Sequence, residues 1–222
     1  MRKGDWYDKI LVEKEEKKWK KRIFSLVLAL MMLMNIVALM PTTKAATFSD
    51  VPDTHWAKSY IEQMQGSNII NGYEDGTFKP EKEVKVGEFI KMATLCVWNV
   101  QPDDNLPFGD HWVTPYAKVA NHFLIVADIY TYDDYERYIT RREAVEIIWK
   151  MYRLTHENIV VDSKGEKLKE YSDESTIVGE EARKYFEYCI QLGLINGFDD
   201  GTLRPTATLT RAQATKLLAV AK

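Results

Sequence analysis

The chain has very few cysteines: only Cys96 and Cys189 occur in 222 residues. Small secreted domains that depend on disulfides contain several cysteine pairs, so a disulfide framework is excluded. Each cysteine falls on the apolar face of a helix predicted below, and Cys189 aligns with Met64 in an earlier copy of the same pattern. We therefore expect both thiols to be buried and unpaired, as small apolar side chains.

Positive charge is scarce outside the first 45 residues. Residues 1–45 contain ten Lys and Arg against five Asp and Glu, whereas the remaining residues contain twenty against twenty-eight, a formal net charge of −8. Proteins that bind nucleic acid carry a basic surface patch. The composition therefore predicts no nucleic-acid partner.

Signatures of catalysis and of metal binding are also missing. No two histidines have the spacing of a zinc site, and the sequence contains neither a nucleophile elbow nor a phosphate-binding loop. The acidic pairs Glu74-Asp75 and Asp199-Asp200 do not have the spacing of a twelve-residue calcium loop. We predict that the chain is not an enzyme and needs no cofactor or metal.

Residues 1–45 have the order of a secretory signal peptide. The basic stretch KKWKKR ends at Arg22, a mostly apolar run covers residues 23–40, and the small residues Thr43 and Ala45 follow. This order predicts cleavage after Ala45 and export. An apolar run of this length is also close to the minimum for crossing a bilayer, so an uncleaved anchor remains the alternative, and the membrane is a partner only in that case.

One ten-residue motif occurs twice, 125 residues apart. NGYEDGTFKP at residues 71–80 and NGFDDGTLRP at residues 196–205 are identical at six positions and similar at the other four. A stretch with helical periodicity precedes and follows each copy, and a less regular copy without the two glycines lies between them. We predict three helix–turn–helix repeats, at 46–100, 108–155 (degenerate) and 171–222, with a linker at 156–170.

The predicted helices are amphipathic, with apolar residues three and four positions apart. One helix pair cannot bury its apolar faces alone, so we expect the three hairpins to pack together as an all-α, pseudo-threefold bundle. The predicted buried faces consist of Trp56, Tyr60, Ile61 and Met64; Phe89, Ile90, Ala93, Cys96 and Val97; Val145, Ile148, Trp149 and Tyr152; Ala182, Tyr185, Phe186, Cys189 and Ile190; and Ala214, Leu217, Leu218 and Ala221.

The turn motif has a structural explanation. In the first copy, Gly72 is predicted to take the left-handed conformation that ends a helix, and Gly76 to supply the positive φ of a tight turn. Pro80 predicts an extended exit from the turn. We assign a structural role to the same residues of both copies: Gly72, Asp75, Gly76, Gly197, Asp200 and Gly201.

The second helix of each repeat has a recognisable start. Thr140 with Glu143, and Thr210 with Gln213, have the spacing of a capping box, in which the two side chains bind each other's backbone amides. The first repeat has Lys85 at the threonine position, which predicts a cap weaker by ~1 kcal/mol.

Together these motifs resemble the S-layer homology repeat of bacterial envelope proteins. The resemblance is carried by FSD at residues 48–50 with HWA at 55–57, by the two copies of the turn, and by LTRAQ at 209–213; FGDHW at 108–112 and ITRRE at 139–143 mark the middle copy. It covers the chain from Phe48 to its end. It implies an all-α, three-lobed bundle with grooves between adjacent repeats.

The resemblance also implies a function and a location. Such modules attach proteins non-covalently to a Gram-positive-type cell wall by binding secondary cell wall polysaccharide, often pyruvylated, that is linked to peptidoglycan. The implied location is the cell wall or cell surface after export. The alternative is a membrane-anchored, purely structural or protein-binding module with little or no glycan binding, whose partner is another envelope protein.

A pyruvylated sugar presents a carboxylate, several hydroxyls and an apolar ring face. An arginine at the first position of a helix can bind a carboxylate bidentately, a tryptophan can stack on a sugar, and an aspartate can accept hydroxyl hydrogen bonds. The predicted glycan-binding residues are Asp50, Trp56, Asp110, Trp112, Arg141, Asp173 and Arg211. The alternatives are that the aspartates cap turns, the tryptophans belong to the core and the arginines are only solvated.

No repeat contains the complete set. Val86 replaces the arginine in the first repeat, where Lys85 or Lys91 offers only a point charge, and Ile177 and Val178 stand where the third repeat lacks a tryptophan. We therefore predict that at most two grooves bind ligand.

Overall fold

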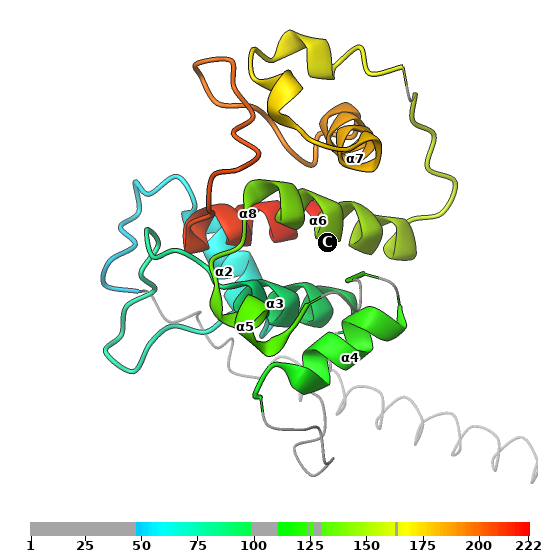
Figure 1. Cartoon of the computed structure of the whole chain (residues 1–222). Helices are drawn as coiled ribbons and strands as arrows, with labels where there is room; N and C mark the ends of the chain where they lie inside the picture. Colours follow the sequence, from blue (N-terminus) through cyan, green and yellow to red (C-terminus); the bar gives the residue numbers. More distant parts are fainter. Residues whose placement is uncertain (1–47, 99–110, 124, 127–129, 163) are drawn as a thin grey trace, which may run out of the picture. The chain divides into compact units, whose positions relative to one another are not determined.

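The computed structural model describes residues 48–98, 111–123, 125–126, 130–162 and 164–222, all of which belong to one unit. Across these residues the regular structure is helical, with three isolated β-bridges and no sheet (Figure 1). The all-α prediction is confirmed. The predicted signal peptide and Asp110 lie outside the described residues.

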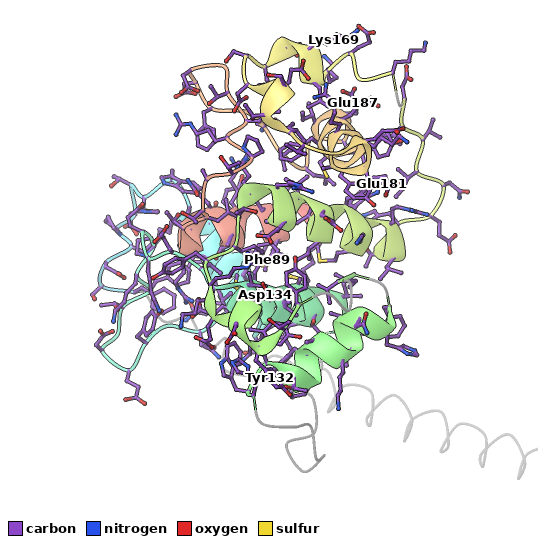
Figure 2. All side chains as sticks on the ribbon, viewed as in Figure 1. Phe89, Tyr132, Asp134, Lys169, Glu181 and Glu187 are labelled. Atoms are coloured by element: carbon purple, nitrogen blue, oxygen red, sulfur yellow. The ribbon has the colours of Figure 1, made fainter. Side chains whose placement is uncertain are left out.

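Each predicted helix is present. They are α2 (Lys58–Gly66) and α3 (Val86–Trp98) in the first predicted repeat, α4 (Thr114–His122) and α6 (Arg141–Thr155) in the middle one, and α7 (Glu180–Gln191) and α8 (Arg211–Ala221) in the third. Two short 3-10 helices, η1 (Leu168–Glu170) and η2 (Glu174–Thr176), lie before α7. Glu187 of α7, labelled beside η1 in Figure 2, accepts hydrogen bonds from the backbone amides of Lys167 and Leu168.

The middle repeat contains one helix that the sequence analysis missed. Helix α5 (Tyr132–Glu136) occupies the place of the glycine-containing turn. The Thr131 hydroxyl accepts a hydrogen bond from the amide of Asp134, whose carboxylate accepts one from the amide of Thr131. This capping box is a sequence signal that was available and not used.

The helices of the three repeats are exchanged. Helix α2 packs against α8, α4 against α3, and α7 against α6, so each first helix packs on the second helix of a different repeat (Figure 1). The three second helices, α3, α6 and α8, pack against one another. The prediction that each repeat forms a helical hairpin is wrong: within the described ranges, the two helices of one repeat are not a closely packed pair. The physical reason is that the long segment between them carries the chain to a neighbouring repeat.

A ring of three backbone hydrogen bonds joins the repeats. The amide of Val84 donates to the carbonyl of Leu209 (3.0 Å), that of Leu209 to Ile139 (3.3 Å), and that of Ile139 back to Val84 (3.0 Å). All three side chains are buried. Each residue lies just before the second helix of its repeat, so the three helix starts meet at one point in cyclic order.

The core combines aromatic and aliphatic side chains from every repeat. Phe89, labelled in Figure 2 on α3, is fully buried, as are Phe78 and Phe186. Cys96 and Cys189 are both buried and unpaired, as predicted, and burial raises the pKa of each thiol to about 12. They therefore behave as apolar side chains at neutral pH.

The prediction of a left-handed conformation at Gly72 and Gly197 is wrong. The left-handed residues after the first helices are Asn68 (φ 56°) and Gly193 (φ 69°). Glycine is needed four residues later for a different reason. A Cβ atom at Gly72 would lie 2.1 Å from Cε1 of Phe48, and an equivalent aromatic ring, that of Tyr171, crosses Gly197 at the same distance. The opening aromatic residues of the first and third repeats thus pack directly on the backbone of their turns.

The tight turn itself has the geometry that its residues require. Gly76 and Gly201 have φ values of 77° and 75°. In the first copy, Asp75 Oδ1 accepts hydrogen bonds from the amide and the hydroxyl of Thr77, and these bonds lower the pKa of the Asp75 carboxyl to about 2. The Asp200 carboxyl has the same environment and a pKa of about 2.

The helix caps agree with the sequence. Capping boxes at Thr140 and Thr210 are both formed. Lys85 keeps half of the box, because its amide donates to Glu88 Oε2 at 3.0 Å while no threonine hydroxyl is available in return.

Among the helices that the structure describes, none is long and apolar enough to cross a membrane. The same residues contain no group of three or more His, Cys, Asp or Glu side chains placed to hold a metal ion.

Candidate binding grooves

Arg211 links the third repeat to the first. It is the first residue of α8, directly after the Thr210 cap, and its side chain extends to the turn at residues 71–80. Its Nε donates to the carbonyl of Phe78 (3.0 Å) and its Nη2 to the carbonyl of Asn71 (3.1 Å). The guanidinium also lies 4.6 Å from the centre of the Phe78 ring, a cation–π contact.

Arg141 links the middle repeat to the third in the same way. It begins α6, its Nη2 donates to the carbonyl of Asn196 (2.7 Å), and its guanidinium lies 5.0 Å from the ring of Phe198. The side chain is only 6% exposed. Unlike the Nε of Arg211, its Nε is buried and has no hydrogen-bond partner within the part of the chain that the structure describes.

The electrostatics of these two arginines are unusual. Burial lowers the pKa of the Arg141 guanidinium below its ordinary value, yet arginine stays protonated under all ordinary conditions. Among the residues that the structure describes, neither Arg141 nor Arg211 forms an ion pair with a carboxylate. Buried charges in proteins are normally paired, whereas the carboxylate that acts on Arg141, that of Asp173, does so without a direct ion pair.

Each arginine lines a groove. Groove A has a volume of about 610 Å³ and groove B of about 260 Å³. Groove A is lined by Trp56, Tyr60, Arg141, residues 193–199, Gln213, Lys216, Leu217 and Val220; groove B is lined by Asn68, Ile69, Ile70, Asn71, Glu88, Lys91, Met92, Leu95, Trp112 and Arg211.

The two grooves are built from equivalent positions. A shift of 125 residues takes the turn of groove B, Asn68 to Asn71, onto that of groove A, and takes Lys91 onto Lys216. In groove A the turn and α8 come from the third repeat, Trp56 from the first and Arg141 from the middle one. In groove B the turn and α3 come from the first repeat, Trp112 from the middle one and Arg211 from the third. The repeated sequence therefore produces a repeated site only because the helices are exchanged.

Both tryptophans are exposed in their grooves. Trp56 is 52% exposed and Trp112 is 48% exposed, and each precedes its helix by two residues. His55 stacks on the ring of Trp56 and His111 lies against that of Trp112, both with ring centres 5.7 Å apart. The alternative that these tryptophans belong entirely to the core is therefore excluded.

Two further polar positions line both grooves, and one of them differs between the grooves. Groove A contains Gln213 where groove B contains Glu88. The Lys216 Nζ of groove A lies 6.0 Å from the centre of the Trp56 ring. Sequence reasoning missed Gln213 and Lys216 as groove residues, although the 125-residue shift and the position of Lys91 were a sufficient signal. Counted over their lining residues, the two grooves carry the same formal charge, because Asp199 in groove A offsets one of its two basic residues as Glu88 does in groove B.

Asp50 and Asp173 have a different place from the one predicted. The Asp50 carboxylate accepts hydrogen bonds from the amides of Phe78 (2.8 Å) and Lys79 (2.7 Å), and Asp173 binds the equivalent amides of the third repeat. Neither aspartate lines groove A or groove B. Their carboxylates close the turns, because two converging backbone amides satisfy a buried edge of each carboxylate.

This closure also changes the exit of the turn. Lys79 and Arg204, which precede the two prolines, have φ values of 57° and 51°, so the prediction of an extended exit is wrong. A positive φ before proline is sterically unfavourable, and the hydrogen bonds to Asp50 and Asp173 offset the strain.

The remaining combination of repeats lacks both key residues. Val86, at the arginine position, is fully buried, and Val178, at the tryptophan position, is 71% exposed. Lys85 forms an ion pair with Glu136 of α5 and does not line groove B, whereas Lys91 does. With valines at both positions, this third combination of repeats has neither a guanidinium to bind a carboxylate nor an indole ring to stack on a sugar.

The fold and the grooves define a class of protein: an all-helical repeat module with two equivalent surface grooves, each joining an exposed tryptophan to an arginine without a carboxylate partner. The S-layer homology domain model matches residues 47–90 and 170–215 of the chain. The two matched segments correspond to the first and third predicted repeats.

The relatives include proteins named for the bacterial surface or for anchoring, and also enzymes. The chain is 25% identical to cell surface glycoprotein 1 of Acetivibrio thermocellus over 78% of its own length and 5% of that protein. It is 25% identical to the cellulosome-anchoring protein of the same organism over 78% of its length and 25% of that protein. A Bacillus sp. endoglucanase is 26% identical over 89% of the chain and 22% of the enzyme, through its S-layer homology region. The chain therefore spans a quarter or less of these relatives.

Proposed function

We propose that the chain attaches non-covalently to the bacterial cell wall by binding an acidic wall polysaccharide in grooves A and B. The observation that carries this proposal is Arg141, a buried guanidinium with an unpartnered Nε and no carboxylate partner, beside the exposed Trp56. In this proposal the ligand supplies the carboxylate that contacts Arg141 directly. A pyruvylated sugar of the secondary cell wall polysaccharide, linked to peptidoglycan, has the matching carboxylate.

The chemistry of each groove fits such a sugar. A guanidinium held in place by a turn carbonyl loses little side-chain entropy when it binds a carboxylate, so it is pre-organised. Trp56 and Trp112 offer a flat apolar face for the sugar ring and an indole N–H for a hydroxyl. In this proposal Asp50 and Asp173 act indirectly, by fixing the turns that hold the arginines.

The location and the third repeat belong to the same proposal. The basic and apolar order of residues 1–45 supports export, and the relatives' names place them at the cell surface or in anchoring. The ring of hydrogen bonds between Val84, Leu209 and Ile139 supports the middle segment as a third, degenerate repeat in a three-lobed bundle. The relatives' anchoring role supports a non-catalytic chain.

A purely structural module is the second candidate, because Arg211 also ties two repeats together through the carbonyls of Phe78 and Asn71. The two candidates predict different results for Arg211→Ala. If the arginine binds glycan, we expect roughly a tenfold or greater loss of affinity for purified cell wall, since a hydrogen bond to a charged group is worth about 1.5–3 kcal/mol. The helical circular dichroism signal stays near that of the parent.

The experiment is co-sedimentation with cell wall before and after chemical removal of the polysaccharide. Trp56→Ala and Trp112→Ala test each groove without disturbing the core, and Val178→Ala, at the equivalent exposed position of the third repeat, is the matched control. An affinity for intact wall that is unchanged by both tryptophan changes together would refute glycan binding in the grooves. A lower melting temperature for Arg211→Ala with unchanged wall binding would support the structural alternative.

A further inference from the structure

The middle repeat contains a cavity that does not belong to groove A or groove B. It lies between α4 and α5, has a volume of about 390 Å³, and shares no lining residue with either groove. One wall is a single face of α4, with Thr114, Ala117, Lys118 and Asn121 at helical spacing. The α5 side presents tyrosines. We call this space the tyrosine cavity.

A buried hydroxyl belongs to a residue of this wall. Thr114 is only 8% exposed, and its Oγ1 is fully buried with no hydrogen-bond partner among the described residues. Threonines in helices commonly donate to the carbonyl four residues earlier, but Thr114 is the first residue of α4 and has no preceding turn of helix to bind. A buried polar group without a partner is disfavoured, so its position at the cavity points to a polar group supplied from outside.

Three tyrosines provide the opposite wall. Tyr132, labelled beside α5 in Figure 2, is about half exposed, and its ring stacks on His111 at 5.7 Å with an angle of 17°. His111 is itself fixed by Glu136, 3.0 Å from its Nε2. Burial raises the pKa of Tyr130, so its hydroxyl stays protonated and can donate a hydrogen bond. Tyr135 completes the wall.

We propose that the tyrosine cavity is a second carbohydrate site, which binds an uncharged pyranose ring such as an N-acetylated hexosamine. Tyrosine rings present flat apolar surfaces with polar edges, which match the faces and hydroxyls of a sugar. Ala117 and Val126 add a small apolar surface to the lining, which suits the methyl group of an N-acetyl substituent. No carboxylate lines the cavity among the described residues, and its volume lies in the range of small-ligand sites.

The inference extends the proposed function, because it assigns acidic sugars to the grooves and uncharged ones to the tyrosine cavity. It also gives the degenerate repeat a role. The loss of the two turn glycines placed α5 and its tyrosines where the other repeats have the tight turn. Two kinds of site on one chain would increase the residence time on a wall through effective concentration.

The test is an NMR titration of the full chain with the β-1,4-linked trisaccharide of N-acetylglucosamine, and separately with purified wall polysaccharide. We expect saturable shifts confined to residues around α4 and α5 for the trisaccharide. Tyr132→Ala should weaken this binding at least tenfold. Tyr138→Ala, a tyrosine of similar exposure outside the cavity, should leave it unchanged.

Thr114→Val provides a second readout, because it removes the hydroxyl and keeps the shape. Loss of an unpartnered buried hydroxyl should raise the melting temperature while weakening trisaccharide binding at least threefold. A lower melting temperature would show that the hydroxyl already has a partner and would overturn the inference. So would equal effects of Tyr132→Ala and Tyr138→Ala, or the absence of saturable shifts. Arg211→Ala, which tests the grooves, should leave trisaccharide binding intact, so the two proposals fail separately.

Discussion

Gly72 offers the most direct test of how the turn is built. In Gly72→Ala the new Cβ would lie 2.1 Å from Cε1 of Phe48 and 2.9 Å from the carbonyl oxygen of Thr77. Ordinary van der Waals contact begins at 3.4 Å, so the Phe48 ring must retreat by the difference, 1.3 Å. The ring cannot move freely, because it is buried and packs against Phe78 with ring centres 5.4 Å apart.

The magnitude follows from this displacement. Forcing extra atoms into a packed core typically costs about 1–3 kcal/mol. In a domain of this size, each kcal/mol lowers the melting temperature by about 2–4 °C, so Gly72→Ala should melt about 2–12 °C below the parent chain. Circular dichroism at a helical wavelength during a thermal ramp measures the shift.

Two further variants test the stated cause. Gly66→Ala is the matched control, because nothing lies within 4 Å of its Cβ position at the end of α2, and we expect no loss of stability. Phe48→Leu removes the clashing edge of the ring, so the double variant with Gly72→Ala should cost less than the sum of the two single changes. Additivity within about 0.5 kcal/mol, or a Gly72→Ala chain that melts at or above the parent temperature, would refute the reasoning.

Two further predictions concern ionisable groups. Burial raises the pKa of Cys96 and Cys189 to about 12, so in the native chain at pH 8 an aromatic disulfide reagent should label both thiols at least 100-fold more slowly than in denaturant; rapid native labelling of either would contradict this. The pKa of Asp200 is about 2, below its unfolded value of about 3.9, so its carboxylate stabilises the fold above pH 4 and ceases to do so as the pH falls through 2. The difference in melting temperature between the parent and Asp200→Asn should therefore shrink from pH 5 to pH 2, and a difference that stays constant would argue against the turn hydrogen bonds.

Local patterns in the sequence were enough to predict the secondary structure of the described residues. Helix positions follow from apolar residues at spacings of three and four, and the capping boxes at Thr140 and Thr210 depend on residues three positions apart. The positive φ of Gly76 follows from its own turn. The candidate arginines and tryptophans could also be identified from the sequence. Arg141 and Arg211 each follow a capping threonine directly, and Trp56 and Trp112 each follow a histidine shortly after the opening of a repeat.

The tertiary structure alone decided which elements meet. Periodicity shows which face of a helix is buried but not what covers it, so the exchange of α2, α4 and α7 among the repeats had no signal in the sequence. The contact of Arg211 with Phe78 spans 133 residues, and the contact of Phe48 with Gly72 sets the need for glycine from outside the turn. Likewise, the Asp50 carboxylate accepts a hydrogen bond from the amide of Phe78, 28 residues further along the chain, and not from its own segment. Grooves A and B exist because side chains from three repeats converge on each of them, and that convergence is a property of packing.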